Sequence, residues 1–306
     1  MPELPEVETV RRGLNKLTLG EEIRGGDVLL PRAIAHPLSV EDFLAGIQGT
    51  AIAHWYRHGK YLLAKLVEPT HTSPQTAPPA GWLGVHLRMT GQLLWLVSTP
   101  IRDSSLAVAE RENINPQETL QKHTRVRLFF KNGDELRFVD QRTFGQMWWV
   151  PPTMSPSTAI TGLKRLGPDP FSEQFSLEYL AGQLQNRRRA IKTSLLDQAL
   201  VAGLGNIYAD EVLFVAGILP TTPCTDLNLE QIGRMRAAII QVLQAAIDAG
   251  GTTFSNFLNV QGVNGNYGGI AWVYNRAGEP CRVCSTPIQR LKLAGRSAHF
   301  CPQCQR

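Results

Sequence analysis

Four cysteines near the end of the 306-residue chain constrain its fold more than any other feature. They form two C-x2-C pairs, Cys281/Cys284 and Cys301/Cys304, which residues 285–300 separate. Two such pairs can place four thiolates around one tetrahedral ion, and this spacing is typical of a structural zinc site. Disulfides are the competing interpretation, but they belong to secreted chains, and no secretion signal is recognisable here. The sequence therefore predicts a small zinc module at the C-terminus.

The charge is concentrated in the same region. Residues 276–306 carry six basic side chains and one acidic one, which equals the net charge of +5 for the whole chain. A basic segment beside cysteine pairs favours a polyanionic partner, nucleic acid first, although a merely solvated basic tail is the alternative.

The remaining composition is that of a globular protein, with 43% hydrophobic and 19% charged residues. No apolar run approaches the roughly 20 residues that cross a bilayer, and the first residues lack the regions of a signal peptide. We therefore expect a soluble, cytoplasmic protein with no membrane partner. Nothing in the sequence indicates an obligate oligomer, so a monomer is expected.

The N-terminal half has the pattern of one helix followed by strands. Helical spacing of apolar residues predicts a helix over Pro5–Lys16. Seven segments with strand character follow, at 51–56, 61–66, 82–87, 92–97, 125–130, 135–139 and 145–150. We expect residues 1–150 to form an antiparallel β-sandwich with a terminal helix. Two polar stretches, 69–80 and about 98–121, are expected to be surface insertions.

The second half is helical, so the fold class is α+β and multidomain. A proline-rich stretch, 151–170, predicts a linker. Helical periodicity then predicts four helices, at 177–185, 190–200, 207–216 and 229–249. We expect residues 171–262 to form a helical DNA-binding domain if nucleic acid is the partner. Residues 263–306 would hold a glycine- and asparagine-rich loop and the zinc module.

The opening Met1-Pro2-Glu3 suits covalent catalysis. Proline is small enough for Met1 to be removed, which would leave a terminal secondary amine beside a carboxylate. An α-amino group has a pKa of about 7.7–8.0, so it is partly unprotonated at neutral pH. Such an amine can form a Schiff base with help from the acid. The alternative is a helix N-terminus that is merely acidic.

Turns in the sequence supply further candidates. Met89 lies in His-Leu-Arg-Met-Thr-Gly, and Arg142 and Phe144 lie in Asp-Gln-Arg-Thr-Phe-Gly. Met and Phe on turns are by default core residues, but proteins that flip a nucleotide use apolar wedges there. Lys60 stands at a strand entry, where a surface lysine is the alternative. Asn206 follows a glycine-rich turn, where it is expected to cap the next helix near a phosphate-binding N-terminus.

Together these segments resemble the formamidopyrimidine-DNA glycosylase family, bacterial enzymes that remove oxidised purines from DNA. The resemblance covers nearly the whole chain, and rests on the opening 1–9, on Asn-Ile-Tyr-Ala at 206–209, on Gly-Gly-Thr-Thr at 250–253 and on the cysteine-rich ending. The loop 262–269 resembles the cyanobacterial and plant branch. The family implies a two-sheet sandwich, a helix–two-turn–helix domain and a β-hairpin zinc finger, with DNA in the cleft between the domains.

The resemblance also implies catalytic roles. Pro2 would attack the sugar C1′, with Glu3 as the acid or base beside it and Glu6 in support. Lys60 would donate a proton in β-elimination and contact a phosphate. Arg296 would hold a phosphate and assist δ-elimination. The implied activity is that of a bifunctional DNA glycosylase and abasic-site lyase of base excision repair, with one structural Zn2+.

The implied partner is duplex DNA that contains oxidised purines or abasic sites. The residues implied to contact it are His86, Met89, His123, Arg142, Phe144, Arg188 and Asn206. Met89, Arg142 and Phe144 would fill the space left by the flipped base, with Arg142 facing the orphan cytosine. The other four would hold the backbone, and for Arg188 the run of three arginines allows a shift of one.

Two departures from the family pattern leave the lesion preference open. Ser255 stands where relatives often carry a lysine, and the loop 261–269 has its own composition. One alternative is a superfamily member that prefers oxidised pyrimidines, like endonuclease VIII, which the Leu-Pro-Glu-Val opening argues against. Another is a DNA-binding protein without catalysis, which the intact Pro2 and Glu3 argue against.

Overall fold

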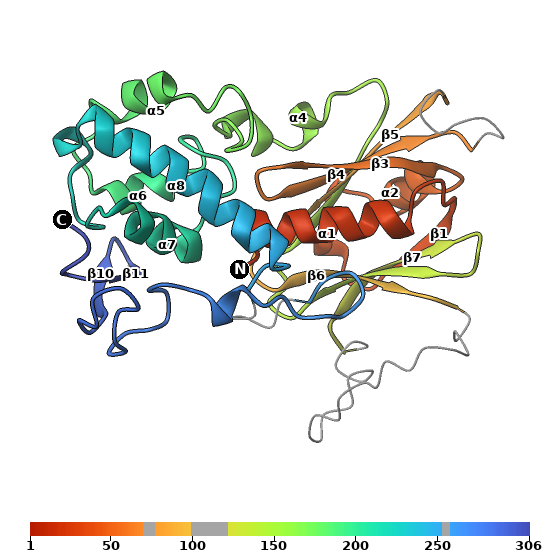
Figure 1. The fold of residues 1–306 in the computed structure, drawn as a ribbon. Helices are drawn as coiled ribbons and strands as arrows, with labels where there is room; N and C mark the ends of the chain where they lie inside the picture. The colour runs from red at the N-terminus through yellow and green to blue at the C-terminus, as the bar shows by residue number, and fades with distance from the viewer. Residues whose placement is uncertain (70–76, 99–121, 253–257) are drawn as a thin grey trace, which may run out of the picture.

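The chain folds into two lobes, and its N-terminus lies between them (Figure 1). The structure, a computed structural model, describes residues 1–69, 77–98, 122–252 and 258–306. One lobe is a β-sandwich, and the other combines helices with a β-hairpin. Most of the two expected insertions, 69–80 and 98–121, and Ser255 lie outside the described residues.

Two sheets form the sandwich. The five-stranded sheet has the order β2 (Ile34–His36), β9 (Gln146–Val150), β5 (Pro79–His86), β4 (Tyr61–Val67) and β3 (Ala51–His58). The four-stranded sheet has the order β1 (Ile23–Val28), β7 (Thr124–Phe130), β8 (Glu135–Asp140) and β6 (Gly91–Leu96). Strand β7 alternates buried and half-buried residues, so one of its faces packs into the core. Trp55, Leu62 and Phe138 are among the side chains buried there.

The seven expected strands are confirmed to within a few residues, but strands β1 and β2 and a helix between β2 and β3 are among the elements that the sequence prediction missed. Strand β1 contains two adjacent glycines and shows no clear alternation, and β2 is three residues long. Strand β2 also pairs in parallel with β9, so the prediction of a wholly antiparallel sandwich was wrong at this edge. Helix α2 (Val40–Ile47) begins after Ser39, whose hydroxyl accepts a hydrogen bond from the Asp42 amide.

Helix α1 (Leu4–Leu17) belongs to the hydrophobic cores of both lobes. Leu4 packs in the core of the helical lobe, whereas Val7, Val10 and Leu14 pack in the core of the sandwich. The amide of Leu4 donates to the carbonyl of Gly203 at 3.0 Å, which ties the first turn to the helical lobe. The N-terminus is therefore fixed at the junction of the lobes rather than on an outer surface.

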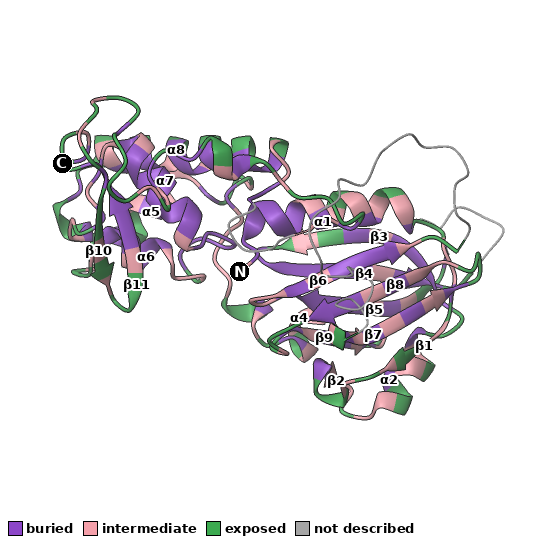
Figure 2. Cartoon of the chain, turned by 90° about the horizontal axis from the view of Figure 1, so that it is seen from below, coloured by how far each residue is buried: buried purple, intermediate pink, exposed green. Residues whose placement is uncertain are grey.

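The helical lobe is built around α7 (Asn206–Ala216) and α8 (Leu229–Asp248), with α5 (Leu177–Leu184) and α6 (Ile191–Leu195) beside them. Figure 2 shows that α7 is buried along most of its length. Helix α6 is shorter than the expected 190–200. It ends because the Asp197 carboxylate accepts a hydrogen bond from the Ala199 amide at 3.0 Å, which forms a turn instead of another helical turn.

The proline-rich stretch 151–170 packs against the sandwich. It contains α4 (Pro156–Ala159) and the 3-10 turn η2 (Leu163–Arg165), and Ile160 and Leu163 are buried against Tyr61 and Trp148. Further 3-10 turns lie at Pro31–Ala33 (η1), Cys224–Asp226 (η3) and Tyr267–Gly269 (η4). The chain ends in the antiparallel hairpin β10 (Gln289–Leu293) and β11 (Arg296–Phe300). None of the helices in the described ranges is long and apolar enough to span a bilayer.

Candidate functional site

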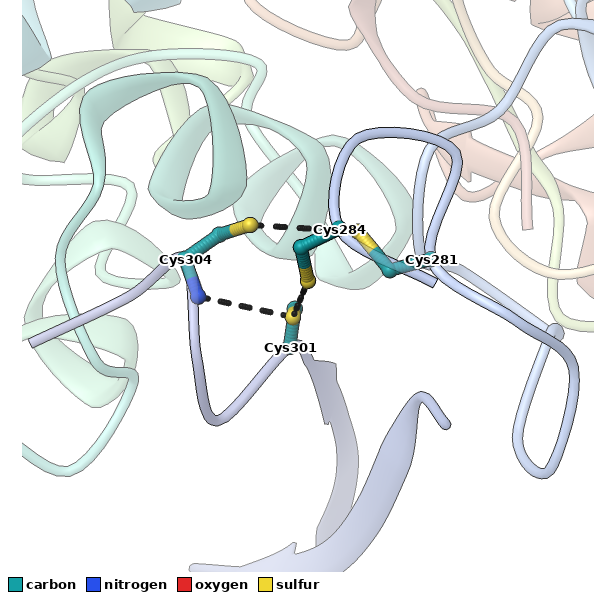
Figure 3. A group of neighbouring side chains, drawn as sticks. All are labelled: Cys281, Cys284, Cys301 and Cys304. Carbon is teal, nitrogen blue, oxygen red and sulfur yellow. Dashed lines mark hydrogen bonds between the residues drawn. The ribbon is translucent and has the colours of Figure 1, made fainter. Parts of the chain in front are cut away.

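The four cysteines converge at the base of the C-terminal hairpin (Figure 3). Their sulfur atoms all lie within 4.8 Å of one another, with 3.9 Å between Cys281 and Cys304 and 3.4 Å between Cys284 and Cys301. These distances are too long for a disulfide and close to the ~3.8 Å that separates sulfur ligands around tetrahedral zinc. The donor set therefore fits one structural Zn2+, as the sequence predicts.

A cavity of about 390 Å³ lies at the junction of the lobes. The expected site residues that line it are Glu3, Lys60, Met89, Asn206 and Arg296, together with Met1. They come from the residues just before α1, the β3–β4 turn, the β5–β6 turn, α7 and β11. The fold thus gathers residues from both lobes around the chain terminus. Pro2 is buried between two of the lining residues, Met1 and Glu3.

Glu3 caps helix α7 from the other lobe. Its carboxylate accepts hydrogen bonds from the amides of Ile207 at 3.1 Å and Tyr208 at 3.5 Å. Gly205 permits this approach, because a Cβ there would lie 2.2 Å from the carboxyl carbon of Glu3. Burial raises the pKa of Glu3 to about 7, against the opposing charge of Lys60. Glu3 can therefore exchange a proton near neutral pH.

The cap on α7 corrects the expectation for Asn206. Gly205 is the N-cap, Asn206 is the first helical residue, and its side chain makes no capping hydrogen bond. The amides expected to be free for phosphate already donate to Glu3. Asn206 still lines the cavity, and its buried Oδ1 accepts no hydrogen bond from the described part of the chain.

Glu6 lies beneath Glu3 and joins three segments. Its carboxylate accepts hydrogen bonds from the Glu3 amide at 2.8 Å, the Tyr208 hydroxyl at 2.6 Å and the Thr252 amide at 2.8 Å. Burial raises its pKa. Glu6 is 1% exposed and is not among the residues that line the cavity, so its hydrogen bonds fix the first residues of the chain.

Lys60 and His86 are buried basic residues of the sandwich. Burial lowers the pKa of Lys60, and the carboxylates of Glu3 and Glu6 oppose this effect. Burial, with Arg88 and Lys60 nearby, lowers the pKa of His86 to about 3. Because the Arg88 amide donates to Nδ1 of His86 at 3.0 Å, the neutral ring carries its proton on Nε2.

The turn residues lie beside the cavity at one edge of the sandwich. Met89 lines both this cavity and a neighbouring hollow of about 540 Å³, which Phe144 also lines. Phe144 is 54% exposed, and the guanidinium of Arg142 lies 5.1 Å from the centre of its ring. His123 precedes β7, and its Nδ1 accepts from Arg125 at 3.2 Å.

Arg188 differs from its two neighbours. Arg187 and Arg189 both pair with Asp197, at 2.9 and 2.6 Å, whereas Arg188 is exposed and forms no ion pair within the described ranges. Its guanidinium is therefore available for another anion.

Comparisons with known proteins agree with this architecture along the whole chain. Family models match residues 1–147 (formamidopyrimidine-DNA glycosylase N-terminal domain), 166–257 (formamidopyrimidine-DNA glycosylase H2TH domain) and 278–306 (zinc finger found in FPG and IleRS). A formamidopyrimidine-DNA glycosylase of Nostoc sp. is 65% identical over 305 residues, covering 100% of both chains. The chain belongs to the formamidopyrimidine-DNA glycosylase family.

Solved structures of this family have the same fold. A Lactococcus lactis FPG variant in complex with Fapy-dG containing DNA superposes with a TM-score of 0.81, at 32% identity and covering 100% of both chains. The MutM (FPG) protein of Thermus thermophilus superposes with a TM-score of 0.79, at 35% identity and covering 99% of this chain and 98% of that one.

This family member also has site residues that the sequence analysis missed. Lys192 of α6 is 1% exposed, and its Nζ lies 2.6 Å from Oδ1 of Asp210 on α7 and donates to the carbonyl of Ser297. The other oxygen of Asp210 accepts from the amide and Nδ1 of His299. Ser297 follows Arg296, so this buried group fixes the strand that carries Arg296 into the cavity. An acidic residue in the middle of the mostly apolar helix α7 was the available signal.

Proposed function

We propose that the chain is a bifunctional DNA glycosylase and abasic-site lyase of base excision repair that excises oxidised purines and then nicks the strand. The observation that carries the proposal is the cavity between the lobes, which brings Glu3, Lys60 and Arg296 to the buried position of Pro2. Its partner is duplex DNA with 8-oxoguanine, a formamidopyrimidine or an abasic site. The protein acts in the bacterial cytosol, where the chromosome lies.

The first step is displacement of the damaged base. With Met1 removed, the Pro2 nitrogen uses its lone pair to attack C1′ of the flipped nucleotide, and the N-glycosidic bond breaks with its electrons moving to the base. The proton that the secondary amine loses neutralises the departing base. Glu3 supplies the proton that opens the sugar ring, so that nitrogen and C1′ form an iminium ion. A carboxyl with a pKa near 7 suits this role, because it holds a proton at neutral pH and releases it readily.

The second step is strand cleavage. The iminium ion at C1′ acidifies the proton on C2′, and loss of that proton expels the 3′ phosphate by β-elimination. A further elimination expels the 5′ phosphate. Lys60, whose pKa burial lowers, donates a proton in β-elimination and contacts a phosphate. Arg296 holds a phosphate and assists δ-elimination.

The remaining residues bind DNA. His86, His123, Arg188 and Asn206 hold the backbone, and Met89, Arg142 and Phe144 occupy the space of the flipped base. The zinc, bound by the four cysteines, maintains the finger and takes no part in the reaction.

Borohydride trapping tests this function directly. The substrate is a duplex with one 8-oxoguanine opposite cytosine, and the expected product is a covalent complex whose adduct maps to Pro2. A duplex with a preformed abasic site serves as the second substrate. Failure to trap either duplex with zinc-loaded protein that begins at Pro2 would contradict the proposal.

A preference for oxidised pyrimidines is the second candidate. The Lactococcus lactis Fpg has also been solved with an oxidised pyrimidine containing DNA, at a TM-score of 0.80 to this chain. Excision rates on matched duplexes with 8-oxoguanine and with an oxidised pyrimidine discriminate the two, and faster excision of the pyrimidine would favour the second.

A further inference from the structure

Two neighbouring turns carry the residues proposed to replace the flipped base. Residues 87–90 connect β5 to β6, and residues 141–145 connect β8 to β9. Strand β5 pairs with β9 in one sheet, and β6 pairs with β8 in the other. Each turn therefore carries the chain from one sheet to the other, and the two turns lie side by side at the same end of the sandwich. Met89 lies on the first turn, and Arg142 and Phe144 lie on the second.

A buried carboxylate joins the two turns. Asp140, the last residue of β8, is 1% exposed. Its Oδ2 accepts a hydrogen bond from the Gly145 amide at 2.7 Å, and its Oδ1 accepts one from the Thr90 hydroxyl. The Thr90 oxygen in turn accepts from the Arg142 amide at 2.9 Å. Thr90 and Asp140 thus connect the first turn to both ends of the second.

These hydrogen bonds hold the backbone of the two turns in a conformation that is unfavourable by itself. Arg88 has φ 53° and Thr143 has φ 57°, a left-handed conformation that is unfavourable for residues with a Cβ. Such conformations persist where the surroundings determine them. Gly145 allows the second turn to close on the core, because a Cβ there would lie 2.3 Å from Phe138.

We call Met89, Arg142 and Phe144, the residues proposed to replace the flipped base, the wedge. Its two apolar side chains are not buried in a hydrophobic core. Phe144 is 54% exposed, and Met89 is half-buried at the cavity. Their positions therefore depend on the backbone of the two turns rather than on core packing. The same Asp140 also accepts, through its carbonyl, a 2.8 Å hydrogen bond from Arg125, which contacts His123.

We infer that Thr90 and Asp140 are positioning residues that hold Met89, Arg142 and Phe144 as one rigid wedge. This inference rests on the proposed function, in which the wedge replaces a base extruded from the duplex. A wedge must keep its shape against the stacked bases, and preorganised groups lose less conformational freedom when they insert. Arg32 also donates to the Thr143 hydroxyl, and Arg88 donates to Gln146, but Thr90 and Asp140 form the hydrogen bonds that join the first turn to both ends of the second.

The test compares two variants of Thr90 on two substrates. Thr90→Val keeps the shape of the side chain and removes its hydrogen bonds, whereas Thr90→Ser keeps the hydroxyl. Under single-turnover conditions, we expect Thr90→Val to slow excision of 8-oxoguanine opposite cytosine roughly tenfold, as loss of two hydrogen bonds predicts. The second substrate has the same sequence, with a preformed abasic site in place of 8-oxoguanine. The rate at which Thr90→Val cleaves it should differ from the wild-type rate by less than about twofold, because no base has to be extruded. Thr90→Ser should restore excision.

Phe144→Ala is the reference for the wedge itself. The double variant with Thr90→Val should be slower than Phe144→Ala alone by less than the effect of Thr90→Val in the wild-type background, because Phe144 is one of the three side chains that Thr90 positions. If Phe144→Ala slows excision and Thr90→Val does not, or if Thr90→Val slows both reactions equally, the positioning role is wrong while the wedge stands. If Phe144→Ala also leaves excision unchanged, the wedge and the positioning role both fail. Wild-type protein inactive on both duplexes would instead contradict the proposed function.

Discussion

At the residue scale, the site depends on groups whose chemistry is altered by burial. Glu3 and Lys60 are 2% and 7% exposed, and they lie close enough for each to change the pKa of the other. Burial disfavours the charged form of both, so it raises the pKa of Glu3 to about 7 and lowers the pKa of Lys60. Pro2 lies beside this pair because the two lobes enclose the N-terminus of the chain.

Pro2 gives the first prediction. Pro2→Gly should reduce trapped complex and strand cleavage by roughly 100-fold or more, because the secondary amine is lost. Affinity for the lesion duplex should stay within about threefold, since phosphate contacts supply most of the binding energy. Trapping and equilibrium binding are measured on the same preparation. Equal loss of both would mean that Pro2 has a structural role.

Glu3 gives a prediction about stability and pH. Its pKa in the folded protein is about 7, against an ordinary value of 4.5, so the folded state binds the proton more tightly than the unfolded state does. Stability from this group is therefore complete below about pH 4.5 and is lost as the pH rises through 7. Glu3→Gln cannot ionise, and should gain about 1–3 kcal/mol over wild type between pH 5 and pH 8 while losing activity. Urea unfolding at both pH values measures this, and a pH-independent difference would contradict it.

At the element scale, the finger and the helical lobe are joined by a buried charge group. Lys192 from α6, Asp210 from α7 and His299 from β11 meet where little water reaches them. Moving one partner away from such a group would leave a buried charge without its counter-charge, which is strongly destabilising. This cost holds α6, α7 and β11 in one arrangement. This arrangement and the zinc site together fix the position of Arg296 at the start of β11.

The zinc site gives the third prediction. Removal of the metal should abolish binding of lesion DNA, because a four-thiolate finger folds only with its ion. Cys301→Ser should lose both zinc and binding, measured by metal analysis and fluorescence anisotropy. Cys224→Ser is the matched control, because that thiol lies in the helical core beside Ser194. Unchanged binding after verified metal loss would refute the role of the finger.

At the scale of the whole molecule, α1 joins the lobes, and the basic residues that we propose to bind DNA come from both. Leu4 packs in one core and Val10 in the other, while Glu3 and Glu6 bind α7 and the segment after α8. Lys60 belongs to the sandwich, and Arg188 and Arg296 to the helical lobe. A duplex held by all three, as we propose, would span the junction, and its affinity would depend on the relative position of the lobes.

The salt dependence of binding gives the fourth prediction. Affinity should fall steeply with salt, and Arg188→Ala should reduce the slope of log K against log salt by about one unit. Arg187→Ala is the matched control and should leave the slope unchanged, because Arg187 is paired with Asp197. Titrations at several salt concentrations measure both. A slope change in Arg187→Ala and none in Arg188→Ala would place the contact one residue earlier.

The sequence by itself determined the features that depend on local pattern. The C-x2-C spacing predicts the zinc site, alternation predicts seven strands, and the family motifs name the candidate residues. Local reasoning failed where a competing contact decided the outcome. It extended α6 past Leu195, where the Asp197 side chain turns the chain, and it assigned the cap of α7 to Asn206.

Only the tertiary structure decided how these residues act together. Glu3 and Ile207 are 204 positions apart, yet the first caps the helix of the second. Thr90 and Asp140 are 50 positions apart and meet because two crossings between sheets lie side by side. Contacts at such separations leave no periodic signal, because they depend on how packed elements meet rather than on the order of neighbouring residues. The sequence determines which chemical group each residue carries, and the fold determines the pKa and the partners of that group.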